Sequence, residues 1–310
     1  MHAGFRHAHG DWLEDAPRTV YRCRSMLLLD LLEYLTTPCS WRVRSMGFLT
    51  SSLQVQARFR RCRRAWEPHL AATRSAILHA ADRCGERRKA VVLGAGLLHD
   101  IPLRELSASF REVILADIVF PWASRLAARR FANVRCVQAD VTETIHSIAR
   151  EQGAPLPRSQ PARFLDEPAL DFTVSVNLLS QLPVIPKRYL RRGDSPEVEA
   201  WSHHLQTAHL DYLRKLPGRV ALISDTGGMH RDRAGAIVAR WDNLHGLELP
   251  APDAVWEWNL APAPEADPCL DHLVRVAAFS DWKGQPCAPT RCIPPAEAGM
   301  PASGAPIPSP

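Results

Sequence analysis

A short apolar run that ends in two glycines constrains the fold of this chain more than any other feature. Residues 90–93, Ala-Val-Val-Leu, lead directly into Gly94-Ala95-Gly96. Because apolar and polar residues do not alternate in it, the run is typical of a strand buried on both faces of a parallel sheet. Glycines let the backbone turn sharply and approach a ligand closely. Such a turn after the first strand of an α/β sheet is where nucleotide-like cofactors bind.

The sequence after this turn predicts strands that alternate with helices. Strands are expected at residues 112–117, 134–138, 171–176 and 219–224, and helices at about 101–109, 121–130, 142–150 and 196–216. This alternation favours an α/β fold with a doubly wound, mostly parallel sheet. Residues 255–260 and 272–279 are strand-like, with only a proline-rich loop between them. They therefore predict an antiparallel C-terminal hairpin.

The two ends of the chain differ from this central part. Apolar residues recur at helical spacing over about 19–35 and 45–83, with Pro68 as a break or a new first turn. We therefore expect an N-terminal helical cap or arm over residues 1–84, followed by a Rossmann-like domain over residues 85–280. Residues 281–310 are rich in Pro, Ala, Gly and Ser, which predicts a disordered tail.

Composition narrows the class of protein. The chain has 310 residues, 46% of them hydrophobic, which is enough for a sizeable core. Its net charge of +5 is mild, so nucleic acid is an unlikely partner, and the arginines of residues 58–64 predict a solvated helix. The eight cysteines form no Cys-x-x-Cys pair, which favours reduced thiols. No apolar run reaches the roughly 18 residues of a membrane span, and we expect a cytoplasmic protein.

Residues 85–280 resemble a class I S-adenosylmethionine-dependent methyltransferase. The resemblance rests on the glycine turn, on Asp117 at the end of the second strand, on Asp140 after the third, and on the terminal hairpin. It implies a seven-stranded sheet, six strands parallel and one antiparallel, and S-adenosyl-L-methionine as the cofactor. The methyl acceptor is not determined: a small molecule is preferred, followed by a protein and then RNA.

The resemblance also implies roles for particular residues. The backbone of the glycine turn would lie against the methionine part and the sugar of the cofactor. Asp117 would accept hydrogen bonds from the ribose hydroxyls, Asp140 would accept one from the adenine amine, and Asn177 would lie beside the point of methyl transfer. The residues assigned to the cofactor are Gly94, Ala95, Gly96, Asp117, Ile118, Asp140, Val141 and Asn177. Asn177 is also the candidate catalytic residue, and no metal site is predicted.

Two departures from the family pattern keep other interpretations open. Val92 stands where the family usually has an acid, and Leu98 where it has a third glycine. Contact with the cofactor's amino group must then come from elsewhere, for example from backbone carbonyls near Gly94 or Asn177. The alternatives are an NAD(P)-dependent oxidoreductase, whose fingerprint also has Gly-x-Gly followed by an acid, and a non-catalytic domain that retains the fold. Asp117 and Asp140 could instead cap helices.

Several other polar residues have less specific patterns. His203, His204 and His209 lie on one predicted helix, but their spacing does not place a metal-binding pair on one face. Residues 225–230 follow the fifth strand, and we interpret them as a substrate loop or a flexible turn. Trp256 and Trp258 alternate with Glu257, so that both indoles would pack on one side.

Overall fold

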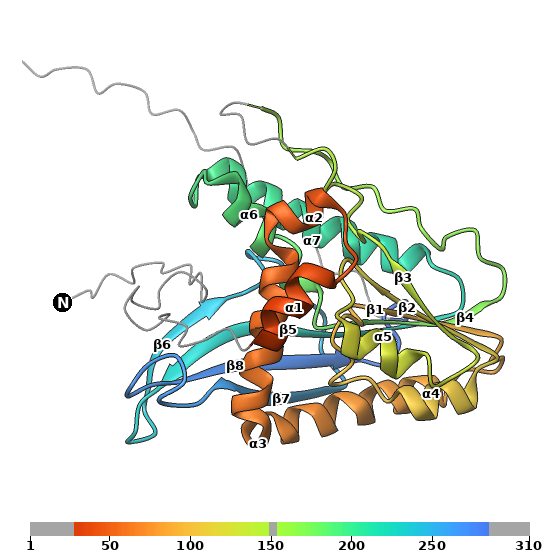
Figure 1. The fold of residues 1–310 in the computed structure, drawn as a ribbon, viewed down its shortest axis with the longest axis horizontal. Helices are drawn as coiled ribbons and strands as arrows, with labels where there is room; N and C mark the ends of the chain where they lie inside the picture. The colour runs from red at the N-terminus through yellow and green to blue at the C-terminus, as the bar shows by residue number, and fades with distance from the viewer. Residues whose placement is uncertain (1–27, 149–153, 285–310) are drawn as a thin grey trace, which may run out of the picture.

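A computed structural model describes residues 28–148 and 154–284 (Figure 1). The helices are α1 (Leu28–Thr36), α2 (Trp41–Met46), α3 (Phe48–Ala81), α4 (Leu103–Ser109), α5 (Trp122–Ala128), α6 (Val184–Leu190) and α7 (Pro196–Lys215), with a 3-10 turn η1 (Leu179–Gln181). The strands are β1 (Lys89–Leu93), β2 (Glu112–Asp117), β3 (Val134–Gln138), β4 (Leu170–Val176), β5 (Arg219–Arg231), β6 (Ile237–Asp242), β7 (Ala254–Ala261) and β8 (Asp271–Phe279).

The strands form one sheet in the order β3-β2-β1-β4-β5-β8-β7, with β6 paired to β5 outside this path. The neighbouring strands from β3 to β5 in this order, which include β2, β1 and β4, pair in parallel. Strand β8 is antiparallel to both β5 and β7. The predicted α/β fold, with a doubly wound, mostly parallel sheet and an antiparallel C-terminal hairpin, is confirmed. The seven strands of the path also agree with the sheet that the methyltransferase resemblance implies.

Strand β6 is an eighth strand that the sequence did not predict, and it exists because β5 is longer than expected. Residues 225–231 continue β5 instead of forming a loop, and residues 227–231 pair with β6. In the structure a Cβ on Gly228 would lie 2.1 Å from the Trp241 ring. The glycine therefore gives room to an indole of β6, and the prediction of a loop at 225–230 was wrong.

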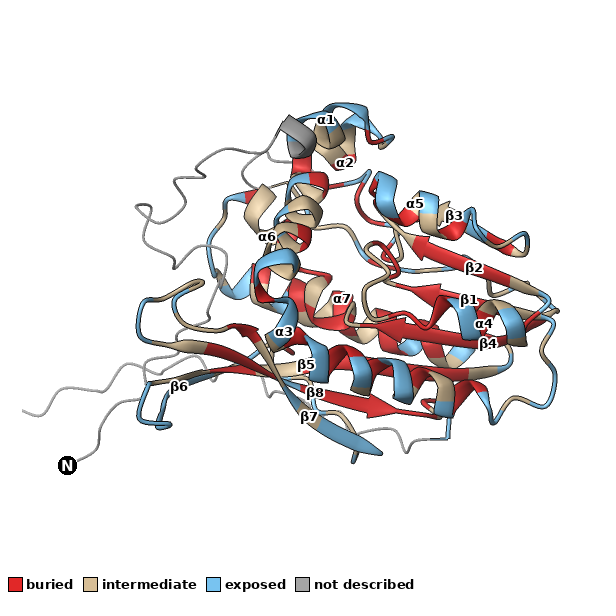
Figure 2. Ribbon diagram, turned by 60° about the horizontal axis from the view of Figure 1, so that its bottom comes forward, coloured by how far each residue is buried: buried red, intermediate tan, exposed pale blue. Residues whose placement is uncertain are grey.

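Helices cover both faces of the sheet (Figure 1). One apolar cluster joins α3 and α4 to a face that includes Val92, Leu115 and Val174, and another joins α7 to the opposite face, which includes Val91, Ile114 and Leu222. Neighbouring residues of a strand, such as Val91 and Val92, belong to different clusters because successive side chains of a strand point to opposite faces of the sheet. The central strands are buried and β6 is largely exposed (Figure 2).

Helix α3 runs past one end of the strands and then along the sheet (Figure 1). Its helical geometry is interrupted at Cys62, whose φ is −101° and ψ is 15°. Pro68 further on removes the backbone N–H that the Arg64 carbonyl would otherwise accept, and proline is a common cause of helix bending. Helix α3 packs on β7, and its half after Pro68 also joins the core through Leu70 and Ile77.

Two further predictions differ from the structure. Residues 142–148 form turns and no helix, because the Asp140 carboxylate accepts the backbone N–H groups of Thr142 and Ile145 and so closes a compact loop. The tail predicted to be disordered from residue 281 begins with an ordered segment, in which Trp282 is fully buried. Residues 1–27, 149–153 and 285–310, which include Cys23, Cys287 and Cys292, lie outside the described residues.

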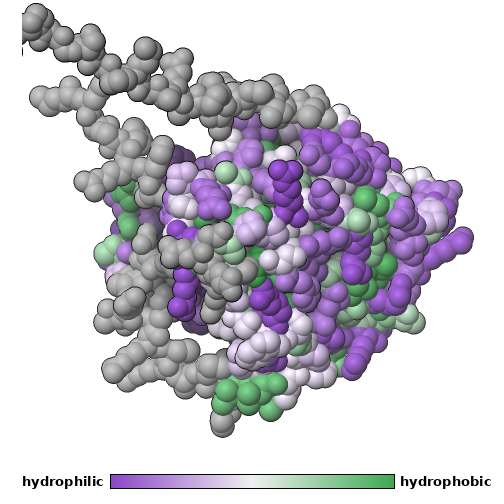
Figure 3. Space-filling model, turned by 90° about the horizontal axis from the view of Figure 1, so that it is seen from above, coloured by the Kyte–Doolittle hydropathy of each residue, from purple (hydrophilic) through white to green (hydrophobic). Residues whose placement is uncertain are grey.

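The face of the molecule seen in Figure 3 is mostly hydrophilic. In the view of Figure 3 the apolar residues form separate small patches among polar ones. Over residues 28–148 and 154–284, none of the helices combines the length and the apolar composition that a membrane crossing needs.

Candidate active site

A cavity of about 290 Å³ lies along the end of the sheet at which the parallel strands terminate. Its lining follows the strand order: Asp140 after β3, Asp117 on β2, Gly94 after β1, Asn177 after β4, Asp225 on β5, Val274 on β8, and Trp258 and Leu260 on β7. Helix α3 covers it with residues from Phe48 to Leu70. The carboxyl ends of parallel strands are where α/β sheets bind ligands.

The glycine turn leaves no space for side chains. Gly94 has a φ of +83°, and a Cβ placed on it would lie 2.5 Å from the carbonyl oxygen of Val176. A Cβ on Gly96 would lie 2.9 Å from the Asp117 carboxyl carbon. Both glycines line the cavity, whereas Ala95 between them is fully buried and is not part of the lining. Glycine is therefore required at both positions by sterics, and backbone faces the cavity there.

Asp117 points its carboxylate at this turn. Its Oδ2 accepts the backbone N–H of Gly96 at 2.8 Å, and its Oδ1 accepts that of Val119 at 3.3 Å. Burial raises the pKa of Asp117 to about 6, against the opposing effect of these backbone donors. Ile118 lines the cavity beside it. The arrangement brings together a carboxylate and a backbone turn from neighbouring strands, as the sequence predicted.

Asp140 lies in the same cavity lining but is engaged by its own loop. Its Oδ1 accepts the backbone N–H and the hydroxyl of Thr142, at 2.9 and 2.7 Å, and its Oδ2 accepts the N–H of Ile145 at 2.8 Å. Asp140 thus caps backbone N–H groups, as the alternative interpretation of the sequence allowed, but the segment that it caps is a loop and no helix. Val141 lines the cavity next to it, so the adenine contact of these two residues stays a prediction.

Asn177 stands at the centre of the lining in a left-handed conformation with a φ of +47°. Its backbone N–H donates to the Ile223 carbonyl at 2.8 Å, which fixes it between β4 and β5. Its Nδ2 donates to Asp100 Oδ2 at 2.8 Å. Its Oδ1 is buried and has no hydrogen-bond partner among the described residues. An unpaired buried amide oxygen is costly in a finished core and is expected where a ligand completes the site.

Asp100 is a lining residue that the sequence analysis did not identify. It lies two residues after Leu98, which has a φ of +59° and so retains a left-handed backbone at the position of the family's third glycine. Burial raises the pKa of Asp100, while Asn177 opposes the rise. Asp100 therefore places a carboxylate in the cavity although Val92 replaces the family's usual acid.

His69 is a second lining residue that the sequence did not indicate. Its ring stacks on Trp258, with centroids 4.0 Å apart and planes 5° apart, and Trp256 Nε1 donates to its Nδ1 at 3.0 Å. Burial lowers the pKa of His69 to about 3, so the ring is neutral at pH 7. Because Nδ1 accepts, Nε2 carries the proton. His69 Nε2 lies 3.4 Å from Asn177 Nδ2, so two N–H groups meet there.

Neither the three histidines of α7 nor the arginine run forms a binding site of its own among the described residues. His203 contacts the His245 carbonyl, His204 accepts the N–H of Ser159, and His209 contacts the Ser175 hydroxyl. Within residues 28–148 and 154–284, His, Cys, Asp and Glu side chains form no group of three suited to a metal ion. Arg58 and Arg61 both contact Glu265, and Arg58 also lines the cavity.

Comparison with known proteins yields structural similarity and no match in sequence. Neither protein-family models nor curated protein sequences match the chain. A Burkholderia thailandensis 1,6-didemethyltoxoflavin-N1-methyltransferase, solved with 1,6-didemethyltoxoflavin and S-adenosylhomocysteine, is 18% identical. The alignment covers 79% of this chain and 92% of that one, with a TM-score of 0.36.

Two further solved structures are similar to a comparable degree. The complex of DhpI with S-adenosylhomocysteine is 14% identical over 72% of this chain and 93% of that one, with a TM-score of 0.34. An O-methyltransferase family protein from Burkholderia thailandensis is 13% identical over 82% and 68%, with a TM-score of 0.33. The fold of this chain is established by its own strand order.

Proposed function

We propose that this protein is an S-adenosylmethionine-dependent methyltransferase whose cofactor occupies the cavity from Asp140 to Asn177. The observation that carries the proposal is the glycine turn facing Asp117. Cβ atoms at Gly94 and Gly96 would strike Val176 and Asp117, so bare backbone and a carboxylate meet at this place in the cavity. A carboxylate at a strand end suits the vicinal hydroxyls of a ribose, and a bare backbone suits a closely packed cofactor.

The amino-acid end of such a cofactor has matching groups on the other side of the turn. Asp100 is half-buried in the lining and its carboxylate accepts from an amide. Arg74 lowers its pKa through charge but forms no ion pair with it among the described residues. An ammonium group would supply the missing charge. His69 Nε2–H and Asn177 Nδ2–H are two donors 3.4 Å apart, and a carboxylate has the two oxygens to accept from both. Asp100 thus takes the part of the acid that is missing at Val92.

The bound cofactor would supply a methyl group on a positively charged sulfur. The residues of this chain would position that group and keep water away from it, which is the main requirement for direct transfer to an acceptor. Helix α3 covers the cavity through Val55 and Leu70, and Trp258 and Leu260 close its far end. Asn177 separates the two halves of the cavity, so we place the point of transfer beside it. A small molecule remains the preferred acceptor.

Titration calorimetry with S-adenosylhomocysteine and with NAD tests the proposal. We expect heat of binding with the first compound and none with the second. Asp117→Asn should weaken binding at least about tenfold, since hydrogen bonds to a charged group are each worth about 1.5–3 kcal/mol. Asp211→Asn is the matched control, because Asp211 is exposed on α7 and its replacement removes the same charge. Binding of NAD alone would indicate an oxidoreductase, and binding of neither compound would indicate a domain without a working pocket.

A further inference from the structure

The cavity contains one more buried carboxylate than the cofactor needs. Asp225 lines the cavity on β5, beyond Asn177, and is only 5% exposed. It shares its face of β5 with Ala221 and Ile223, both in the apolar cluster under α3. The next residue, Thr226, has no partner in the pairing of β5 with β8, so the regular register ends at Asp225. Such bulges are over-represented next to active sites, where they direct a side chain.

Only neutral donors contact this carboxylate. The Ser180 hydroxyl donates to its Oδ1, and Asn243 Nδ2 donates to its Oδ2 at 2.9 Å. No ion pair joins Asp225 to any basic residue among the described ones. Arg58 is the only arginine or lysine in the described lining, and it faces Glu265. Burying a carboxylate without a cation is costly, and each oxygen still has a lone pair for a further donor.

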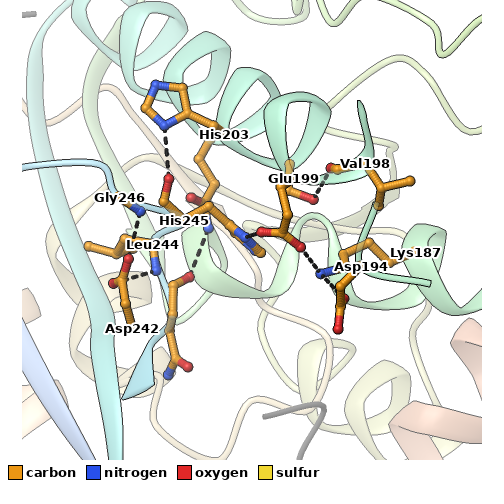
Figure 4. A network of polar contacts seen from close by, with 12 residues as sticks. Lys187, Asp194, Val198, Glu199, His203, Asp242, Leu244, His245 and Gly246 are labelled. Atoms are coloured by element: carbon orange, nitrogen blue, oxygen red, sulfur yellow. Dashed lines mark hydrogen bonds and ion pairs between the residues drawn. The ribbon is translucent and has the colours of Figure 1, made fainter. Parts of the chain in front are cut away.

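The two donors are themselves held in place by further polar contacts. Gln181 Nε2 donates to the Ser180 hydroxyl oxygen at 3.1 Å, which turns the hydroxyl hydrogen toward Asp225. Asn243 belongs to a loop that Figure 4 shows from close by. In that loop His245 Nδ1 contacts Glu199 at 2.6 Å, and Asp242 accepts the N–H groups of Leu244 and Gly246. Glu199 in turn accepts from Lys187 at 2.7 Å. These contacts, with the bond from Gln206 Nε2 to the Asn243 carbonyl at 3.0 Å, hold the loop that supplies one donor to the carboxylate.

The lining beyond Asn177 is mainly apolar, with the Gln181 amide as a polar group beside Ser180. Trp258 and Leu260 come from β7, Val274 from β8 and Leu182 from the turn after η1. A ligand in this half of the cavity would therefore have an apolar body and a polar hydrogen directed at the carboxylate. A carboxylate or phosphate on the ligand would meet the charge of Asp225 without a cation to offset it.

Building on the proposed function, we propose that Asp225 is a catalytic residue that receives the proton of the methyl acceptor. The acceptor is then a hydroxyl or amine on an aromatic or similarly apolar body. In the hydroxyl case the O–H bond breaks and its proton passes to an Asp225 oxygen. The oxygen's electron pair forms the new C–O bond to the methyl group. The C–S bond breaks with its electron pair left on sulfur, which becomes a neutral thioether.

Two matched probes test this assignment on protein saturated with S-adenosylhomocysteine. 2-Naphthol presents a hydroxyl on an aromatic body, and 2-naphthoate presents a negative charge on the same body. By calorimetry we expect wild-type protein to bind the naphthol at least about tenfold more tightly, since like charges in contact cost several kcal/mol. Asp225→Asn should reduce this preference to within about threefold, because the amide can donate to the naphthoate. Asp211→Asn should leave the preference unchanged.

The outcomes separate this inference from the proposed function. If wild-type protein gives no heat with S-adenosylhomocysteine, the proposed function fails. If that compound binds but Asp225→Asn keeps the full preference, Asp225 does not face the acceptor and the inference is overturned. It is also overturned if the naphthoate binds as well as the naphthol to wild-type protein, or if neither probe binds at about 1 mM. Should Asp225→Asn not fold, as judged by circular dichroism, Asp225→Ser removes the charge with a smaller side chain and is tested in the same way.

Discussion

Gly94 and Gly235 have nearly the same positive φ, +83° and +88°, in very different surroundings. A Cβ at Gly94 would lie 2.5 Å from the Val176 carbonyl oxygen, whereas a Cβ at Gly235 would have no heavy atom within 4 Å. Alanine at either position bears the left-handed penalty of about 1–2 kcal/mol. We predict that Gly94→Ala loses clearly more stability in urea unfolding than Gly235→Ala and also loses binding of S-adenosylhomocysteine. Equal losses of stability would mean that the turn can move away from Val176.

The raised pKa of Asp117, about 6, predicts how cofactor binding depends on pH. The ribose hydroxyls donate to the ionised carboxylate, so a protonated Asp117 must lose its proton when the cofactor binds. The affinity for S-adenosylhomocysteine should therefore be constant above pH 7 and fall by up to about tenfold per unit below pH 6. Asp117→Asn should show lower affinity and a flatter profile in calorimetry from pH 5 to 8. Any slope that remains in this variant would come from Asp100, whose pKa burial also raises.

At the scale of single residues, the sequence indicated the cavity residues whose position follows from the predicted strands. Gly94, Gly96, Asp117 and Asn177 each end or follow a predicted strand, and parallel strands bring such ends to one edge. His69 could not be found in this way, because its place depends on contacts with Trp256 and Trp258, far away in the sequence. The roles of these residues toward a cofactor are still predictions.

Trp282 lies in a segment whose composition predicted disorder, but its contacts with other elements hold it in place. Its backbone N–H donates to the Val220 carbonyl at 2.7 Å and its Nε1 to the Leu210 carbonyl at 3.2 Å. The side chain is 0% exposed. We predict that Trp282→Ala lowers the free energy of unfolding by about 3–5 kcal/mol, as for other buried aromatic residues. Trp41→Ala is the control, since Trp41 is 80% exposed, and it should change stability by less than about 0.5 kcal/mol. A loss at position 282 no larger than the control's would contradict the packing.

The elements that the sequence predicted correctly are those with a clear period, and the errors have a common physical cause. Strands β1, β2 and β3 and helix α7 lie within about two residues of their predicted bounds. Ile145 and Ile148 have helical spacing, but each is buried in a cluster with Val43 and Leu190 of other elements, and the segment forms turns. Tertiary contacts thus decided the structure where the local pattern was short.

At the scale of the whole molecule, the cavity has two walls of different origin. The sheet provides one wall, and the other is α3, which precedes the sheet in the chain and covers the cavity from Phe48 to Leu70. The strand order that carries the lining from Asp140 to Trp258 is a property of the assembled sheet. The lining from Asp140 to Asn177 could therefore be predicted from local signals, whereas the part near Asp225 depends on β5, β8 and β7 being in place.

Because α3 closes the cavity, a bound ligand should oppose its local opening. Ligand at about 100 times its dissociation constant stabilises the closed form by about 2.7 kcal/mol, equivalent to roughly 100-fold slower exchange of amides that such openings expose. We predict that S-adenosylhomocysteine slows hydrogen exchange in residues 48–70 and 94–100. Strand β6 is the internal control, since it is exposed, pairs only with β5 and contributes nothing to the described lining. If the ligand slows exchange in residues 94–100 but not in α3, then α3 opens independently of the site. The helix would in that case be no part of the binding machinery.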